Sequence, residues 1–177
     1  MRNANAQRLT TKDWIDAGFA ALSTGGHDFL KAEPLARRIG TTKGSFYWHF
    51  KDVPTYHQIL LEDWESRLAT PPPNSGTNPV SQLRSFVQSL VEQSARLDAA
   101  IRAWGAASPL VQASLMRVDE GRLMYLQSLL SQIGVTNPEM ARIIYAAAIG
   151  MTSLPARGTA TDQDAIGSLV DLVLALR

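Results

Sequence analysis

A short run of basic, hydroxyl-bearing and aromatic side chains gives the sequence its clearest chemical signal. Residues 42–51 read TKGSFYWHFK. Lysine and hydroxyl groups bond base edges and phosphates, rings with polar tips reach phosphate oxygens, and glycine lets a backbone come close to a ligand. This combination is typical of a surface that contacts DNA. The candidate contact residues are Thr42, Lys43, Gly44, Ser45, Tyr47, Trp48, His49 and Lys51.

Positive charge is concentrated around the same run. Five cations and one acid, Glu33, lie between Lys31 and Lys51, so the local net charge is +4, whereas the whole chain carries +1. Local cations favour phosphate binding through counterion release. An ordinary solvated helix face also carries runs of charge. The charge alone therefore does not distinguish a DNA-binding surface from a solvated helix face.

Two short helices joined by a tight turn are predicted to position these residues. We place the first over Pro34–Ile39, because a proline is tolerated in a first helical turn, and we expect Gly40 to end it. Thr42 can cap a second helix over Lys43–His49. A helix held in this way can present its N-terminal end to the DNA major groove, as in a helix-turn-helix.

The second of these helices is expected to have a buried and an exposed side. Phe46 and Phe50 are four residues apart and share one face, which predicts that both pack inward. Trp48 fits either a core position or a DNA-facing one, and we favour partial exposure.

A capped helix precedes this pair and a longer helix follows it. Thr10 or Thr11 can begin the first, which Gly25-Gly26 ends, and the later helix begins near Pro54 and stops before a proline-rich stretch. We therefore predict an all-α fold. Its parts are a three-helix helix-turn-helix DNA-binding domain at 1–53, a connecting helix at 54–70, a linker at 71–79, and a helical ligand-binding and dimerisation domain at 80–177.

The last domain is predicted to be helical throughout, because its apolar residues recur at helical spacing. The final helix is apolar around much of its circumference, which favours a homodimer through 138–154 and 161–176. The alternative is that these residues form the core of a monomer. The predicted helices are Val80–Arg96, Ala99–Ala107 as its continuation or after a kink, Leu110–Ile133, Pro138–Leu154 and Thr161–Leu176.

Methionine and aromatic side chains in the middle helices suit an adaptable apolar pocket. They suit an ordinary core equally well, and for each residue taken singly the core is the simpler interpretation. The candidate pocket residues are Phe86, Trp104, Met116, Met124, Tyr125 and Met151. Nearby charged residues are expected to form surface or interhelical pairs, although one of them could fix a polar ligand group: Arg102, Asp119, Glu120 and Arg122.

Other chemistry finds no support in the sequence. The chain has no cysteine, which excludes disulfides, thiolate catalysis and cysteine-based zinc sites. His27, His49 and His57 lack metal-ligand spacing and no catalytic motif is present, so we predict no catalytic residue, metal site or cofactor. No apolar run approaches the roughly 18–20 residues that cross a bilayer, and the first residues lack a signal-peptide pattern. We expect a cytoplasmic protein.

The order of elements and several short motifs between Thr10 and Leu68 resemble the TetR family of transcriptional regulators. The family pattern is an apolar-Ala pair, a turn glycine, a hydroxyl-capped helix with Gly-Ser, an aromatic-Tyr pair and His-Phe. Here these are Leu35-Ala36, Gly40, Thr42, Gly44-Ser45, Phe46-Tyr47 and His49-Phe50. The rest of the chain resembles the family only in being helical and of suitable length.

The resemblance implies a homodimeric regulator, not an enzyme, that binds a near-palindromic double-stranded DNA operator. As a repressor it would release the operator when a small molecule binds the C-terminal domain. Val53 stands where the family usually carries a lysine, and whether Lys51 makes that phosphate contact instead is left open. The alternative function is a helical protein–protein interaction module whose helix-turn-helix is purely structural.

Overall fold

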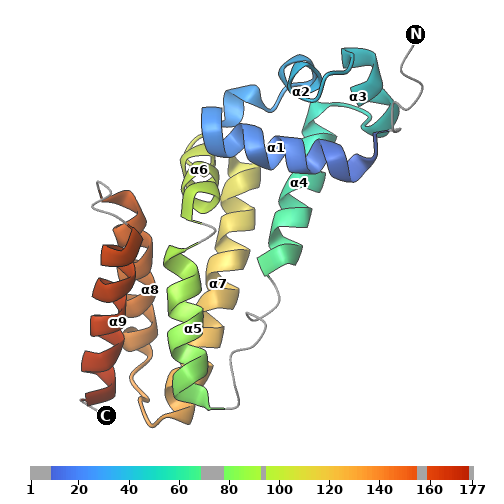
Figure 1. Ribbon diagram of the computed structural model, residues 1–177. Helices are drawn as coiled ribbons and strands as arrows, with labels where there is room; N and C mark the ends of the chain where they lie inside the picture. Colours follow the sequence, from blue (N-terminus) through green and yellow to red (C-terminus); the bar gives the residue numbers. More distant parts are fainter. Residues whose placement is uncertain (1–8, 69–77, 93–94, 155–158, 176–177) are drawn as a thin grey trace. The chain divides into compact units, whose positions relative to one another are not determined.

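A computed structural model describes residues 9–68, 78–92, 95–154 and 159–175 of the 177-residue chain (Figure 1). Within those ranges every regular element is a helix, which confirms the prediction of an all-α fold. The chain divides into two compact units, Met1–Trp64 and Glu65–Arg177. Residues 71–77 of the linker predicted at 71–79 lie outside the described residues.

The first unit begins with a helix whose two ends are fixed by local chemistry. At the start of α1 (Thr11–Gly25), the Thr10 side chain accepts a hydrogen bond from the Asp13 N–H, and the Asp13 carboxylate accepts one from the Thr10 N–H at 2.7 Å. The helix ends where Gly26 takes a φ of 80°, a conformation that glycine adopts without strain. Both predicted ends are confirmed. A short 3-10 helix, η1 (His27–Phe29), follows.

Two seven-residue helices come next. The first, α2 (Ala32–Arg38), starts two residues before the predicted Pro34. A proline is tolerated there because the first N–H groups of a helix have no intrahelical partner. The second, α3 (Lys43–His49), matches its predicted range, and the Thr42 hydroxyl caps it by accepting a hydrogen bond from the Ser45 N–H at 3.3 Å.

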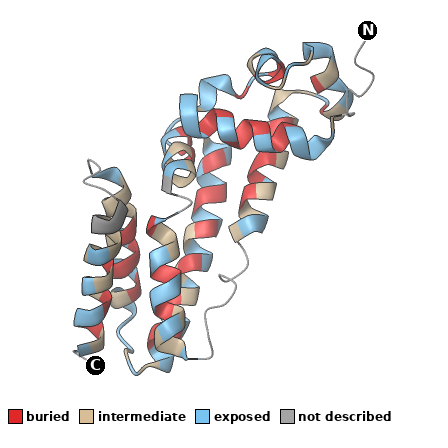
Figure 2. Cartoon of the chain, in the orientation of Figure 1, coloured by how far each residue is buried: buried red, intermediate tan, exposed pale blue. Residues whose placement is uncertain are grey.

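Aromatic side chains hold the first unit together. The Phe46 ring meets the rings of Trp14 and Tyr56 edge-on, with centroids 5.4 and 5.3 Å apart. Tyr56 comes from α4 (Val53–Leu68), and its ring centroid lies 4.8 Å from that of Phe50. Phe46 and Phe50 are fully buried, as predicted. The buried residues of α1 gather on one side of that helix, opposite its exposed side (Figure 2).

Beyond the last residues of α4, five helices make up the described part of the second unit. They are α5 (Pro79–Val91), α6 (Ala95–Gly105), α7 (Pro109–Gln132), α8 (Pro138–Ser153) and α9 (Thr159–Ala175). The predicted helix over Val80–Arg96 extended too far, because α5 ends where Glu92 leaves the helical conformation with φ and ψ both at −89°. Asn137 caps α8 by accepting a hydrogen bond from the Glu139 N–H at 3.0 Å.

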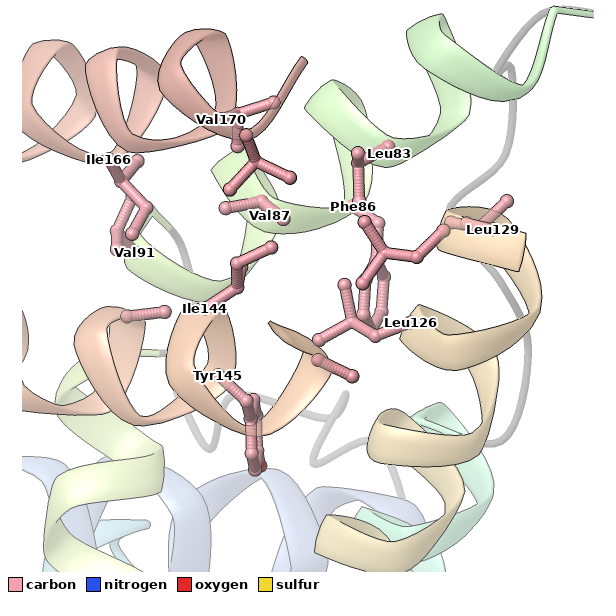
Figure 3. Packing of buried hydrophobic residues seen from close by; sticks show 14 residues of the cluster. Leu83, Phe86, Val87, Val91, Leu126, Leu129, Ile144, Tyr145, Ile166 and Val170 are labelled. Atoms are coloured by element: carbon pink, nitrogen blue, oxygen red, sulfur yellow. The ribbon is translucent and has the colours of Figure 1, made fainter. Parts of the chain in front are cut away.

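The core of the second unit joins α5, α7, α8 and α9. Side chains of α5, among them Leu83 and Val87, lie between those of the other three helices (Figure 3). Tyr145 of α8 stands at the edge of this cluster, with its hydroxyl at the far end of the ring (Figure 3). The apolar core therefore adjoins a polar group.

Candidate nucleic-acid interface

A tight turn sets the orientation of α3 against α2. Gly40 takes a φ of 71°, and the Thr41 N–H donates a hydrogen bond to the Ala36 carbonyl oxygen at 2.9 Å. Because Phe46 points into the core, the opposite side of α3 faces outward.

The outward side of α3 carries an unusually exposed indole. Trp48 is 88% exposed, the largest exposed fraction of any large hydrophobic residue among those described, and Tyr47 beside it is 47% exposed. Gly44 lies one helical turn before Trp48, and a Cβ built on it would meet only the Thr42 hydroxyl oxygen, at 3.7 Å. The surface between Gly44 and Trp48 is therefore open to close approach by a partner.

Polar groups flank this open surface. The Lys43 ammonium nitrogen lies 6.0 Å from the centroid of the Tyr47 ring, so the cation and the phenol stand together. His49 is partly buried, with its ring centroid 6.3 Å from that of Trp14. The structure thus gathers all eight candidate contacts on α3 and at its two ends, and none is fully buried: Thr42, Lys43, Gly44, Ser45, Tyr47, Trp48, His49 and Lys51.

Asp52, the acid beside Lys51, caps the following helix. The Thr55 N–H donates a hydrogen bond to the Asp52 carboxylate at 2.8 Å, which holds the pKa of Asp52 below its usual range. Asp52 therefore stays ionised at neutral pH and caps the start of α4. Val53, where the family resemblance led us to expect a lysine, is the partly buried first residue of that helix.

The candidate pocket residues do not all lie together in the second unit. Phe86 is buried, and the Tyr125 ring stands edge-on to it with centroids 4.8 Å apart. Met151 packs against the same apolar cluster. Met116 and Met124 of α7 are instead 66% and 58% exposed. The remaining candidate, Trp104 of α6, is buried.

Sequence reasoning missed a polar cluster that connects α6, α7 and α8. Arg102 donates two hydrogen bonds to the Asp119 carboxylate, at 2.6 and 2.9 Å. Arg122 donates one to Asp98 at 2.6 Å. The Tyr145 hydroxyl donates to Asp119 at 2.7 Å and accepts from both guanidinium groups, at 3.1 and 3.2 Å. The expected interhelical pairs are present, but Asp98 and Tyr145 had not been assigned to them.

One sequence signal does point to this cluster. Arg122 is buried and lies four residues after Val118 and four before Leu126, both of which are buried too. Residues at that spacing share a helix face, so Arg122 falls on the core-facing stripe of α7. A cation on such a stripe requires a buried partner.

Burial and charge shift the pKa values in the cluster. Burial raises the pKa of the Tyr145 phenol to about 12, so the hydroxyl keeps its proton at neutral pH. Burial by itself would also raise the pKa of Asp119. Hydrogen bonds from Arg102 and Tyr145, with the charges of Arg102 and Arg122, outweigh burial and hold that pKa below its usual range.

The described residues contain neither a metal-binding cluster nor a membrane-spanning helix. No group of three or more His, Asp or Glu side chains there is placed to hold a metal ion. Within the same residues, no helix is long and apolar enough to cross a membrane.

Comparison with known proteins gives a match in structure only. No protein-family model and no curated protein matches the sequence. A transcriptional regulator from Rhodococcus sp. Rha1 superposes with a TM-score of 0.76 at 17% identity, covering 95% of each chain. A TetR transcription regulator from Haloarcula marismortui superposes with a TM-score of 0.74 at 15% identity, covering 92% of this chain and 96% of that one.

A third structure is similar over almost the whole chain. SmeT, the repressor of the Stenotrophomonas maltophilia multidrug efflux pump SmeDEF, superposes with a TM-score of 0.61 at 20% identity, covering 96% of this chain and 90% of its own. The three likenesses show that this chain has the fold of TetR-family transcriptional regulators.

Proposed function

We propose that this chain is a TetR-family transcriptional regulator, not an enzyme, that binds double-stranded operator DNA through α3. The exposed face of α3 carries the proposal: it joins the Lys43 ammonium, the Tyr47 phenol and the Trp48 indole beside the open backbone at Gly44. Such a face supplies donors for base edges and phosphates and an apolar surface for thymine methyl groups. We assign it to the cytoplasm, where it would meet its DNA.

The regulator acts as a homodimer in this proposal. Ile143 of α8 and Leu172 of α9 are 51% and 56% exposed, and a partner protomer would cover these two apolar side chains. These helices correspond to the proposed dimer segments 138–154 and 161–176, of which residue 176 is outside the described ranges. Two DNA-contacting helices about 34 Å apart would address successive major-groove faces of a near-palindromic operator.

The effector is an unidentified small molecule that binds the domain at 80–177. Its binding would shift the connecting helix α4 and change the separation of the two DNA-contacting helices, so that the repressor releases its operator. The ligand can do this only by binding the released state more tightly than the DNA-bound state. The proposed pocket is best supported at Phe86, Tyr125 and Met151, because these side chains belong to or pack against one apolar cluster.

Selection of bound sequences from a random DNA pool, followed by mobility shifts over a salt series, tests this function. We expect affinity to fall steeply with salt and to be lost when Lys43→Ala is combined with Tyr47→Phe. Arg96→Ala, which removes an exposed cation from α6, is the matched control and should bind as the original protein does. Absence of binding at low salt, both to selected DNA and to the gene's own upstream region, would favour an interaction module instead.

A further inference from the structure

A groove of about 390 Å³ opens in the first unit where α2, α3 and the first residue of α4 meet. Three cations and one acid contribute to its walls, so its charge is positive. Neither Lys31 nor Arg37 belongs to the DNA contacts that the sequence motif identifies. The residues that matter for its chemistry are Lys31, Glu33, Arg37, Lys43, Tyr47 and Val53.

The groove cations are available to a new partner. Arg37 pairs with Glu33 at 3.0 Å, but the two side chains are 80% and 67% exposed. Lys31 pairs with Asp28 at 3.6 Å, and both of those side chains are exposed too. Exposed ion pairs contribute little free energy, so a phosphate can replace either acid at small cost.

The neighbouring arginine provides a contrast. Arg38 donates a hydrogen bond to the Ala20 carbonyl oxygen of α1 at 3.3 Å and reaches the Thr24 hydroxyl at 3.5 Å. It is not part of the groove wall. Two arginines adjacent in sequence therefore have different surroundings, one open to the groove and one tied to α1.

We propose that this groove seats a phosphate of the DNA backbone, with Lys31 and Arg37 as positioning residues. The proposal rests on the proposed DNA binding and adds to it a contact from α2. Lys43 lies on both the groove wall and the proposed base-contacting face, so a backbone phosphate in the groove adjoins bases under α3. Val53 brings no charge to the groove from α4, and Lys31, before α2, and Arg37, within it, add positive charge to that of Lys43.

Salt dependence of operator binding tests the proposal. Each phosphate contact contributes about 0.9 to the slope of log K against log salt concentration. The proposed dimer would hold one such phosphate in each of its two half-sites, so Lys31→Gln and Arg37→Gln should each lower that slope, and together lower it by about 1.8, whereas Arg38→Gln should leave it unchanged. Thermal unfolding of each variant checks that the first unit is folded. Equal slopes for the Arg37 and Arg38 variants would overturn the proposal.

Neutralising one DNA phosphate at a time shows which phosphate the groove contacts. Operators that carry a single methylphosphonate at successive positions lose one charge each. At one phosphate in each half-site, the methylphosphonate should weaken operator binding by the original protein. It should have little further effect on operator binding by the Arg37→Gln variant. Additive losses at every position would mean that Arg37 contacts no particular phosphate, against the proposal.

Inorganic phosphate separates a DNA contact from a site for free anions. At matched ionic strength, sodium phosphate should stabilise the DNA-free protein no more than sodium chloride does. Stabilisation that disappears with Lys31→Gln and Arg37→Gln, while the DNA salt slope is unaffected, would assign the groove to free phosphate instead. If the original protein binds no DNA at all, the proposed function itself fails. If it binds DNA but the salt slope is the same after substitution of Lys31 and Arg37, only the proposed phosphate contact in the groove fails.

Discussion

Gly18 of α1 and Tyr56 of α4 approach each other so closely that a Cβ built on Gly18 would lie 1.9 Å from the Tyr56 phenolic oxygen. The same hydroxyl donates a hydrogen bond to the Trp14 carbonyl oxygen, one helical turn before Gly18, at 3.0 Å. Tyr56 is fully buried, and burial raises its pKa. The missing side chain at Gly18 therefore allows this hydroxyl to bond the α1 backbone.

Replacement of Gly18 by alanine is expected to destabilise the first unit. The added methyl group would displace Tyr56 and break its hydrogen bond, lowering the free energy of unfolding by about 2–4 kcal/mol. Gly121→Ala is the control, because a Cβ at that exposed position on α7 meets nothing within 4 Å. It should raise the free energy by about 0.5–1 kcal/mol through helix propensity. Urea unfolding followed by circular dichroism measures both, and equal effects would contradict the close approach.

Trp48 should report DNA binding by its fluorescence. Of the chain's four tryptophans, Trp14, Trp64 and Trp104 are at most 5% exposed, whereas Trp48 is 88% exposed. Iodide should therefore quench mainly the Trp48 emission in the free protein, and operator DNA should protect it. Trp48→Phe removes the quenchable component and serves as the control. If iodide quenches the DNA complex as strongly as the free protein, Trp48 does not face the DNA.

Helix α3 was predictable because local signals define it. The Thr42 cap, the glycine turn before it and the pair Phe46 and Phe50 each act within a few residues along the chain. Those signals gave the range of α3 and its buried side. The start of α2 was less certain, since a proline can occupy any of the first few positions of a helix.

Contacts between distant residues were harder to predict. Asp98 and Arg122 are 24 residues apart, and the groove at Lys31 needs three helices to form it. Helical periodicity says that Met116 and Met124 share one face of α7, but not whether that face meets another helix. The structure leaves both exposed, and no spacing within α7 alone could have shown it.

Removal of the Tyr145 hydroxyl is expected to destabilise the second unit. In Tyr145→Phe the two arginines lose an acceptor and Asp119 loses a donor, which should lower the free energy of unfolding by about 1–3 kcal/mol. Tyr125→Phe is the matched control, since its ring packs on Phe86 in partial exposure, and it should change stability by less than about 0.5 kcal/mol. Equal effects of the two substitutions would show that the Tyr145 hydroxyl contributes nothing to stability.

Acid should weaken the same cluster through Asp119. Its folded pKa lies below the unfolded value of about 3.9, so its contribution is fully present above that pH and is lost as pH falls through the folded pKa. Asp119→Asn lacks this contribution at every pH. Urea unfolding at pH 7 and pH 3 should therefore show a stability difference between the two proteins that shrinks in acid. A difference that grows in acid would mean that the folded pKa is raised.

A charge on the exposed side of α8 or α9 is expected to separate the proposed dimer. Ile143→Lys or Leu172→Lys would place an ammonium group where the partner's apolar side chains should lie, at a desolvation cost that the interface cannot offset. Because the dimer binds two half-sites together, the monomer should bind the full operator at least about 100-fold more weakly. Leu110→Lys, at a 45% exposed residue in the first turn of α7, is the control and should remain dimeric. Sedimentation velocity and mobility shifts on full and half operators measure both effects. Dimers of unchanged affinity in both α8 and α9 variants would place the interface elsewhere on the chain.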